Sequence, residues 1–482
     1  MPLTVLSDSE IHALLITLNK DDILHLQTNL CEALHDYSTG SQETTAGCSG
    51  NNPKRLAIAA PNDHTTLFMP ASTSTSRGIK IVSIAAPANP PHVPSMSSLN
   101  LHKPKTGSPN GSRSNSRSSS PARQAHPSRE SSISSTNPSL NSSTTNTNTT
   151  PTTPSTSTTG LAHSTSYTPS LHSVKSNTST TSSPTTAAHG SLTLLTSTGL
   201  PYAFLAAQEL TAFRTALLAT KIFHIRDRVH SITVFGAGLQ AWWHIRLALL
   251  LRGPEIHHID IINRSFKRAK QLMHDFYTRP EWTAIRDANP KLQFSVLSTE
   301  YKEYEQHLSS HVHKADAIFM CTPATTPLFP AEILTNAEGR RKGRYISAIG
   351  SYRPYMCELH PEILRQAVKK EHKHHHHRHA EKGGVIIVDS LEASLREAGE
   401  IIQAGIEPAQ LVEVGELLMV KKAAMQEVRL GIGEGEPGLK NWLVKGNVIF
   451  KVVGLGLMDI CVGEDIVMLA RERGVGVVVE GF

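Results

Sequence analysis

The chain has 482 residues, of which 39% are hydrophobic and 18% are charged, and its formal net charge is +6 at pH 7. No apolar run approaches the roughly 20 residues of a membrane span, and the first residues lack the pattern of a signal peptide. The five cysteines are scattered without C-x-x-C spacing, which is typical of reduced thiols. We expect a cytoplasmic protein that binds neither membrane nor nucleic acid, since part of the positive charge falls in low-complexity segments.

The first 90 residues predict a mixture of helices and strands. Ser7 and Glu10 have the spacing of a capping box, which predicts that a helix begins there. A second helix and three strands are then predicted, in chain order, at Asp21–His35, Lys54–Ala60, Thr65–Pro70 and Gly78–Ala85. The last of these, GIKIVSIA, is the clearest strand.

Residues 91–189 are dominated by Ser, Thr, Asn and Pro and contain almost no large apolar side chains. Such a segment cannot bury enough apolar surface to offset the entropy lost on ordering, so it is predicted to be a disordered insertion. A second irregular segment, Lys369–Lys382, is rich in histidine and lysine. Its histidines have no fixed ligand spacing, so we interpret it as a solvated loop and predict no metal site.

Regular structure resumes with a predicted strand at Ser191–Leu195 and a predicted helix at Ala203–Thr220. From about residue 221 to residue 390 strands and helices alternate, which is typical of a doubly wound parallel sheet. Its strands are predicted at Ile232–Phe235, Ile259–Ile262, Ala317–Met320, Tyr345–Ile349 and Val385–Val388. The last part predicts, in order, a helix at Leu391–Ala404, a strand at Asn447–Val453 and a helix at Gly463–Arg473.

The glycine turn after the first of these strands is the main functional signal. The segment from Gly236 to Ala241 is a G-x-G-x-x-A fingerprint between an apolar strand and an amphipathic helix. Gly236 permits the tight turn, Gly238 lets the backbone approach a pyrophosphate, and the helix N-terminus faces the phosphates. The residues predicted to bind the cofactor here are Gly236, Ala237, Gly238, Leu239 and Gln240. The alternative is a glycine turn that binds no nucleotide.

The end of the second strand indicates which dinucleotide binds. An NAD-dependent enzyme usually places Asp or Glu there to bond the ribose 2′-hydroxyl, whereas this chain has Asn263-Arg264-Ser265, with Arg268 close behind. A guanidinium with small polar donors would hold a 2′-phosphate, and Asp260 lies inside the strand. We therefore predict NADPH, with NADH as the alternative, and Asn263, Arg264 and Ser265 as further cofactor-binding residues.

Several segments together resemble the ornithine cyclodeaminase/mu-crystallin family. In chain order they are FMPA with GIKIVS, ELTAFRTA, GAGLQAWWHI, AIGSYRPYMCEL and IFKVVGLGLMDI, and they span nearly the whole chain outside the two irregular segments. The resemblance implies an α/β fold with a Rossmann-type parallel sheet domain plus a discontinuous α+β substrate/dimerisation domain. It also implies a homodimer that acts on a small-molecule imino or amino acid.

The expected domain boundaries follow from this resemblance. Residues 1–90 and 190–220 would form the first two parts of the substrate/dimerisation domain, on either side of the insertion. Residues 221–390 would form the Rossmann NADP-binding domain. Residues 391–482 would return to the substrate/dimerisation domain, because alone they look too few to bury a core.

The resemblance also implies which residues bind the substrate carboxylate. Lys80 in GIKIVS matches the family lysine beside the substrate, and Arg214 in FRTA matches the arginine that binds the carboxylate; both are predicted catalytic residues. Arg55 matches an earlier substrate-binding arginine, with Lys54 as the competing assignment. A planar guanidinium suits a carboxylate because it can donate two parallel hydrogen bonds. The structural alternatives are an edge-strand position for Lys80 and an ion pair with Glu209 or another acid for Arg214.

One loop departs from the cyclodeaminase branch of the family. That branch carries an Asp shortly after the strand that here ends at Gly350, and Tyr352 stands in its place. A phenol with a pKa near 10 is a poor general base at neutral pH, so cyclisation of ornithine with loss of ammonia is disfavoured. The loop resembles the mu-crystallin branch, which implies NAD(P)H-dependent reduction of small cyclic imino acids, with hydride added to the carbon next to the carboxylate.

The predicted protein is thus an NADP-dependent oxidoreductase acting on C=N groups. The alternatives are an NAD-dependent ammonia lyase of the ornithine cyclodeaminase type and a non-enzymatic NADPH-binding protein. Thr322, after the Ala317–Met320 strand, is a further predicted cofactor contact, whereas the adjacent Cys321 is not predicted to be a nucleophile. Asp459 matches a late family Asp near the cofactor end, or caps the final helix. The proton donor stays open among solvent, Lys80 and a substrate that is already protonated.

Overall fold

The computed structural model describes residues 2–39, 52–59, 64–85, 189–369, 384–417 and 437–482. These residues all belong to one compact unit. The predicted disordered insertion lies outside the described residues except for His189, where a strand begins, and the histidine-rich segment lies outside them after Lys369. Among the described helices, none is long and apolar enough to cross a membrane.

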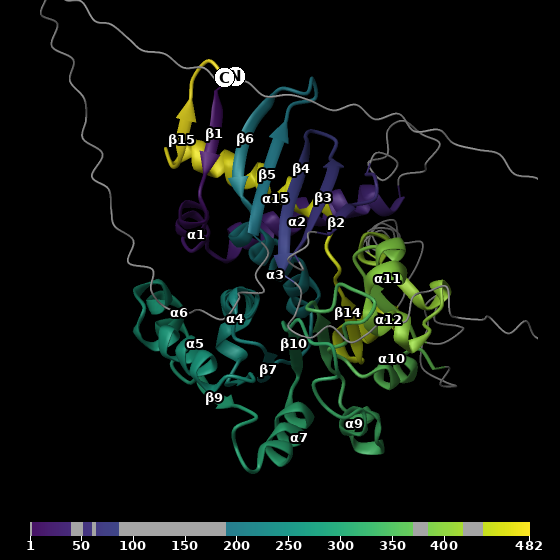
Figure 1. The fold of residues 1–482 in the computed structure, drawn as a ribbon. Coiled ribbons are helices and arrows are strands. Elements are labelled where there is room, and N and C mark those ends of the chain that lie inside the picture. Colours follow the sequence, from purple (N-terminus) through teal and green to yellow (C-terminus); the bar gives the residue numbers. More distant parts are fainter. Residues whose placement is uncertain (1, 40–51, 60–63, 86–188, 370–383, 418–436) are drawn as a thin grey trace, which may run out of the picture. The chain divides into compact units, whose positions relative to one another are not determined.

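One sheet has seven strands in the order β15-β1-β6-β5-β4-β3-β2 (Figure 1). Its strands are antiparallel neighbours except for the parallel pair β1 and β6. Their bounds are β1 Leu3–Leu6, β2 Leu56–Ala59, β3 His64–Ser72, β4 Arg77–Ala85, β5 His189–Leu195, β6 Pro201–Ala206 and β15 Val477–Val479. The first and last strands of the chain therefore pair with each other.

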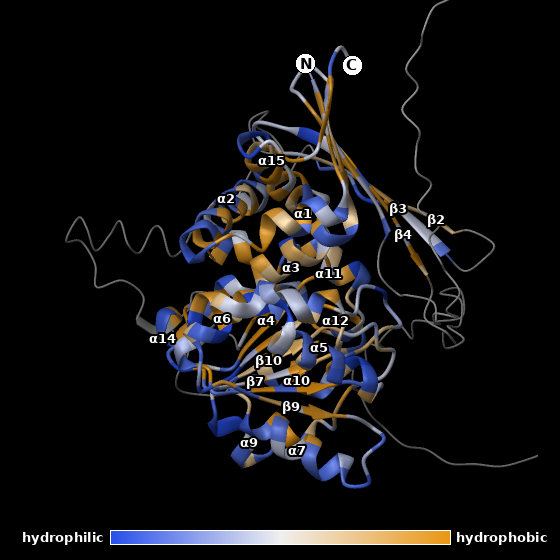
Figure 2. Cartoon of the chain, turned by 90° about the vertical axis from the view of Figure 1, so that its left-hand side faces the viewer, coloured by the Kyte–Doolittle hydropathy of each residue, from blue (hydrophilic) through white to orange (hydrophobic). Residues whose placement is uncertain are grey.

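Helices from distant parts of the chain cover one face of this sheet. Figure 2 shows α1 (Asp8–Leu15), α2 (Lys20–Thr39) and α15 (Gly456–Glu472) together on one side of β3 and β4. Helix α15 contacts β3, β4 and β5, and it packs against α2 and α3 (Ala207–His224). The predicted capping box is confirmed at α1, where Ser7 and Glu10 each accept a hydrogen bond from the other's backbone N–H.

Strand β4 determines which way its lysine faces. Burial alternates along the strand, so Gly78, Lys80, Val82 and Ile84 point to the covered face. This alternation is the ordinary period of two of a strand with one face covered. Lys80 is therefore buried beneath the helices, and the exposed edge-strand alternative for this residue does not hold.

The second sheet has eight strands in the order β13-β12-β14-β11-β10-β7-β8-β9, and every neighbouring pair is parallel. Strands β10, β11 and β14 are buried along their whole length, as expected for a parallel sheet covered on both faces. The strand bounds are β7 Ser231–Phe235, β8 His258–Ile262, β9 Gln293–Leu297, β10 Ala317–Met320, β11 Tyr345–Ala348, β12 Ile386–Val388, β13 Leu411–Glu413 and β14 Val448–Lys451.

The chain leaves β7 toward β8 and β9 on one side and continues with β10 and β11 on the other, so the order reverses between β7 and β10. In doubly wound folds this reversal creates a crevice at the carboxyl ends of the strands, where dinucleotides bind. The accompanying helices are α4 Leu239–Arg252, α5 Phe266–Thr278, α6 Thr283–Ala288, α7 Tyr304–Lys314, α8 Glu332–Thr335, α9 Ala337–Arg341, α10 Pro361–Ala367, α11 Leu391–Glu397, α12 Gly399–Ala404 and α14 Pro437–Lys445.

Several predicted bounds change in the structure. The helix predicted from Ala203 begins at Ala207, because residues 203–205 pair with both β1 and β5, and Ala206 pairs with β5 and completes β6. The final helix begins at Gly456 rather than Gly463. The helix predicted at Leu391–Ala404 is two helices, interrupted at Ala398. Strands β13 and β14 come from the segment 391–482, yet they pair in the parallel sheet, with β14 between β11 and β12.

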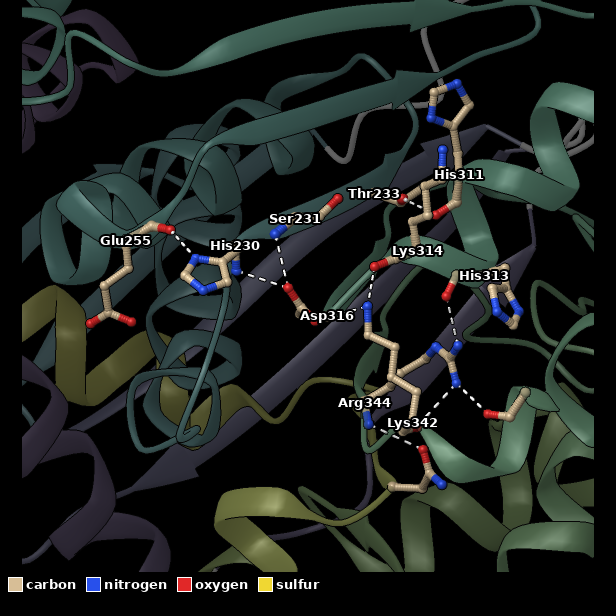
Figure 3. Close-up of polar contacts among 12 residues, drawn as sticks. His230, Ser231, Thr233, Glu255, His311, His313, Lys314, Asp316, Lys342 and Arg344 are labelled. Carbon is tan, nitrogen blue, oxygen red and sulfur yellow. Dashed lines mark hydrogen bonds and ion pairs between the residues drawn. The ribbon is translucent and has the colours of Figure 1, made fainter. Parts of the chain in front are cut away.

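The amino edge of the parallel sheet is held by a polar network (Figure 3). Asp316, which directly precedes β10, accepts hydrogen bonds from the backbone N–H groups of His230 at 2.8 Å and Ser231 at 3.0 Å and pairs with Lys342 at 2.9 Å. The buried guanidinium of Arg344 donates to three backbone carbonyls, including that of His313 at 2.7 Å. This edge joins neighbouring strands through these hydrogen bonds and one ion pair, while Arg344 Nε has no partner among the described residues.

Candidate functional site

A cavity of about 380 Å³ lies where three parts of the fold meet. One wall is the covered face of β3 and β4, another is α3, and the third is formed by the loops at the carboxyl ends of β7, β10, β11 and β14. The predicted site residues that line it are Arg55, Lys80, Arg214, Gly238, Leu239, Gln240 and Thr322. The other predicted cofactor residues, Gly236, Ala237, Asn263, Arg264 and Ser265, are not among its lining residues.

The glycine turn follows β7 and opens α4, as its sequence predicts. Gly236 has φ +108°, and a Cβ atom there would lie 2.8 Å from the carbonyl oxygen of Cys321, so only glycine fits. Gly238 is the N-cap residue of α4, and no atom lies within 4 Å of the position its Cβ would take. The turn thus leaves open space in front of a helix N-terminus, which suits a phosphate.

Polar groups at the end of β8 shape the neighbouring turn. Ser265 caps α5, and the side-chain amide of Asn263 donates to the Ser265 carbonyl at 2.9 Å. Asp260 bonds to Ser295 at 2.5 Å and to His311 at 2.9 Å, so the only nearby acid of the strand is already engaged. Arg264 and Arg268 are exposed, and neither has an ion-pair partner among the described residues.

Arg268 is a site residue that the sequence prediction did not include. It lies in the first turn of α5 and lines the cavity beside the glycine turn. Its place in the sequence, three residues after the N-cap Ser265, is the signal that could have identified it, because the first turn of such a helix faces the same crevice. The turn after β8 and the start of α5 therefore carry two guanidinium groups, those of Arg264 and Arg268, rather than one.

A buried ion cluster contributes Lys80 and Arg214 to the lining of the same cavity as the glycine turn. The Nζ of Lys80 donates to Asp459 Oδ1 at 2.7 Å and to the hydroxyl of Thr211 at 2.7 Å. The Nε of Arg214 donates to the same Asp459 oxygen at 3.2 Å, and its Nη1 lies 3.4 Å from the sulfur of Met458. Lys80, Arg214 and Asp459 are exposed by only 2%, 4% and 0%. Two cations thus share one carboxylate oxygen.

The partner of Arg214 is Asp459 rather than Glu209. Glu209 instead accepts hydrogen bonds from His12 at 2.6 Å and Trp243 at 2.8 Å. Asp459 lies in the first turn of α15, and its carboxylate is directed to the two cations instead of capping the helix. The Nη2 of Arg214 has no acceptor among the described residues, although the side chain lines the cavity. That nitrogen is therefore available to a ligand.

A glycine loop brings the backbone close to Arg214. Gly454 follows β14 and has φ +95°, and a Cβ there would lie 2.8 Å from Arg214 Nη2. Asp389, at the end of β12, accepts the backbone N–H groups of Val453 at 3.1 Å and Gly454 at 2.6 Å. Burial raises the pKa of Asp389, while these N–H groups and Arg214 lower it. The loop is thereby fixed against the guanidinium.

Arg55, and not Lys54, reaches the main cavity. Arg55 pairs with Glu397 and is largely buried, and burial, with Arg396 nearby, lowers its pKa to about 10. Lys54 pairs with Glu392 at 2.5 Å, its side chain is 70% exposed, and it lines a separate cavity of about 60 Å³. Arg55 lies on the boundary, because it lines both cavities.

The charge of the cavity wall is one-sided. Four lining residues, Arg55, Lys80, Arg214 and Arg268, are basic, and none of the described lining residues is acidic. Burial lowers the pKa of Lys80 to about 8; Asp459 opposes this shift and Arg214 adds to it. Tyr352 also lines the cavity, and burial raises the pKa of its phenol. The arrangement favours a small anion and offers no carboxylate to an ammonium group.

No family model matches the sequence. An uncharacterised protein of Saccharomyces cerevisiae is 30% identical over 289 residues, which cover 55% of this chain and 70% of that protein. A Delta(1)-pyrroline-2-carboxylate reductase of Bacillus cereus is 28% identical over 289 residues, with coverages of 58% and 70%. The ketimine reductase mu-crystallin of Mus musculus is 27% identical over 218 residues, with coverages of 45% and 54%.

Two solved structures share the fold. The Delta(1)-pyrroline-2-carboxylate reductase of Thermococcus litoralis, in complex with NADH and L-proline, superposes with a TM-score of 0.56 at 16% identity, covering 98% of this chain and 99% of that one. A probable ornithine cyclodeaminase from Bordetella pertussis superposes with a TM-score of 0.53 at 17% identity, with the same coverages.

Proposed function

The chain belongs to the ornithine cyclodeaminase/mu-crystallin family, and from that premise we propose that it is an NAD(P)H-dependent reductase of small cyclic imino acids. The observation that carries the proposal is that a pair of buried cations, Lys80 and Arg214, lines the same cavity as a glycine fingerprint. The pair of cations suits a substrate carboxylate, and the glycine fingerprint suits a nicotinamide dinucleotide.

The carboxylate site follows from unused hydrogen-bond donors. A buried guanidinium needs partners for its five N–H bonds, and Arg214 directs its Nε to Asp459 while its Nη2 has no acceptor among the described residues. A substrate carboxylate placed there would gain charge-assisted bonds from Arg214 and lie next to the ammonium of Lys80. Asp459 keeps both cations in position, so the site is preorganised rather than assembled on binding.

The residues around the glycine turn fit a dinucleotide. Gly236 and Gly238 leave the helix N-terminus of α4 accessible from the cavity, and Thr322 lies beyond them at the end of β10. A bound nicotinamide supplies the hydride. Lys80 and Arg214 would hold the carboxylate so that the adjacent C=N carbon faces the β10 and β11 loops, which orients the acceptor carbon without any covalent step by the protein.

We propose NADPH as the preferred cofactor, on the charges at the end of β8. Arg264 and Arg268 have no acidic partner among the described residues, and Asp260 is engaged with Ser295 and His311. A 2′-phosphate would therefore meet two available guanidinium groups, while the acid of the strand itself, Asp260, is not free to bond a ribose 2′-hydroxyl. NADH is the alternative cofactor.

The cavity lining supports reduction over loss of ammonia. Cyclisation of a diamino acid needs a group that accepts protons and binds ammonium, and no acidic residue is present among the described lining residues. Tyr352, which the resemblance matches to the Asp of the cyclodeaminase branch, lines the cavity, and burial raises the pKa of its phenol. Both features suit a substrate that carries a carboxylate and an imine but no second amine.

We also propose that the protein is a cytoplasmic homodimer. The seven-stranded sheet is covered by helices on one face, and on the described strands several large apolar side chains are exposed, including Leu56 at 61%, Ile58 at 51% and Phe204 at 43%. Exposed apolar side chains of this size suit an interface with a second copy. Light scattering of the purified protein tests the dimer directly.

The activity is tested by following nicotinamide absorbance with purified protein and a five- or six-membered cyclic imine carboxylate, using NADPH and NADH in parallel. Oxidation of NADPH that is lost in Arg214→Ala supports the reductase and the carboxylate site together. Release of ammonia from ornithine with NAD, without net oxidation, would instead establish a cyclodeaminase. Tight NADPH binding with neither reaction would establish a non-enzymatic binding protein.

A further inference from the structure

A buried carboxylate joins two loops of the cavity wall from behind. Glu358 is fully buried, and its Oε1 accepts the backbone N–H of Thr322 at 2.7 Å and the Thr322 hydroxyl at 2.9 Å. Its Oε2 accepts the backbone N–H of Gly350 at 2.5 Å. Thr322 follows β10 and Gly350 follows β11, and both line the cavity. One side chain thus fixes the ends of two adjacent parallel strands.

The two loops are packed too closely to shift independently. A Cβ at Gly350 would lie 1.8 Å from the carbonyl oxygen of Thr322 and 2.7 Å from Glu358 itself. A residue larger than glycine would therefore separate the loops. The contact places the backbone of the β11 loop directly against that of the β10 loop, with the carboxylate of Glu358 bridging them.

Glu358 is itself held by a second buried layer. Its backbone N–H donates to Glu400 at 2.9 Å, and Glu400 lies 3.2 Å from the ammonium of Lys451 on β14. Glu400 and Lys451 are each exposed by only 1%. Burial raises the pKa of Glu358 to about 8, with Lys451 lowering it and Glu400 raising it. Three ionisable groups are therefore buried behind this wall, although none of them lines the cavity.

The position of these loops gives the carboxylate a function. In doubly wound folds the adenosine half of a dinucleotide lies over the strands on one side of the reversal, and the nicotinamide half over those on the other. Here the glycine turn and the Arg264 turn belong to β7 and β8, so the β10 and β11 loops lie on the nicotinamide side. We propose that Glu358 is a positioning residue for the nicotinamide half of the cofactor, acting through Thr322 and Gly350.

This inference rests on the proposed nicotinamide cofactor, and the two can be tested separately. The experiment compares Kd for NADPH, from the fluorescence of the bound dihydronicotinamide, with Kd for 2′,5′-ADP, which lacks the nicotinamide half. In Glu358→Gln the amide N–H₂ must face one of the donors, so we expect the affinity for NADPH to fall about tenfold. The affinity for 2′,5′-ADP should change by less than about twofold. If the wild type prefers NADH, ADP replaces 2′,5′-ADP.

Asp316→Asn is the matched control, because Asp316 also accepts two backbone N–H groups but lies at the amino edge of the same sheet. It should lower thermal stability and leave the ratio of the two affinities unchanged. The same unchanged ratio in Glu358→Gln would overturn the positioning role while leaving the proposed function intact. A wild type that binds neither NADPH nor NADH would overturn both proposals.

A second variant, at a residue that is itself a predicted cofactor contact, keeps the proposal falsifiable if Glu358→Gln does not fold. Thr322→Val removes only the hydroxyl that donates to Glu358, while the backbone N–H bond remains. We expect the same pattern at a smaller size, about threefold for NADPH, with the fluorescence emission of the bound cofactor shifted from that of the wild type. Wild-type affinity and emission in this variant would argue against the proposal.

Discussion

Arginine side chains are buried near both edges of the parallel sheet, and their hydrogen-bond donors have different acceptors at the two edges. At the amino edge the guanidinium of Arg344 donates to three backbone carbonyls, and that of Arg226 donates to the carbonyls of Leu443 at 2.5 Å and Gly446 at 2.6 Å. At the cavity beyond the carboxyl edge, Arg214 shares one oxygen of Asp459 with Lys80. A buried cation with few partners, facing a cavity, is one that a ligand completes.

The largest expected effect distinguishes Arg214 from Arg344. Arg214→Ala should lower kcat/KM for a cyclic imino acid on the order of 10²- to 10³-fold, because a buried charged hydrogen bond to the substrate is lost. Affinity for NADPH should stay near that of the wild type. Arg344→Ala is the contrasting variant: it should destabilise the protein by about 2–4 kcal/mol while kcat/KM of the folded protein is retained. Steady-state kinetics and thermal melts measure both, and equal effects on kcat/KM would break the comparison.

The next effect concerns the glycine beside Arg214. Gly454→Ala adds a Cβ where Arg214 Nη2 is 2.8 Å away and forces alanine to φ +95°. We expect kcat/KM to fall about 10- to 30-fold as the guanidinium is displaced. Gly405→Ala is the matched control, because Gly405 also has positive φ, at +65°, but has open space around it. Both variants should lose about 1–2 kcal/mol of stability, and only Gly454→Ala should raise KM for the imino acid.

The third effect is a pH dependence of substrate binding. The pKa of Lys80 is lowered to about 8, so the ammonium is present below that pH and is lost above it. KM should therefore rise with pH above about 8, by up to about tenfold per unit. Because Asp459 raises the pKa of Lys80, Asp459→Asn should move the rise in KM to lower pH. Steady-state kinetics from pH 6 to 10 measure this pH dependence of KM. If KM begins to rise at the same pH in Asp459→Asn as in the wild type, the pH dependence belongs to another group.

The smallest effect tests the end of β8. Arg264→Ala should weaken NADPH binding about three- to tenfold, since an exposed guanidinium gives a modest ion pair with a phosphate. Affinity for NADH should be unchanged, and Arg268→Ala should act in the same direction. Fluorescence titrations with both cofactors provide the measurement. Equal losses for NADPH and NADH would place these residues at the pyrophosphate instead of the 2′-phosphate.

Local patterns in the sequence predicted much of the fold. The glycine turn after β7 and the capping box at α1 depend on neighbours in the chain, and both form as expected. Patterns of longer range were less informative. Residues 203–206 look helical by composition, but pairing with β1 and β5 places them in a strand. Strand β14 could not be assigned to the parallel sheet from the sequence, because its partners β11 and β12 come from other parts of the chain.

The sequence by itself indicated two of the cationic side chains of the candidate site, since Lys80 and Arg214 occur in recognisable segments and both line the cavity, whereas it did not single out Arg268. Only the tertiary structure decided what holds them. Asp459 reaches them from a helix more than 200 residues away in sequence from Arg214, and Glu358 joins two loops whose contact no local pattern records. A carboxylate in an ion cluster is selected by distance and burial in three dimensions, and neither quantity is encoded by spacing along the chain.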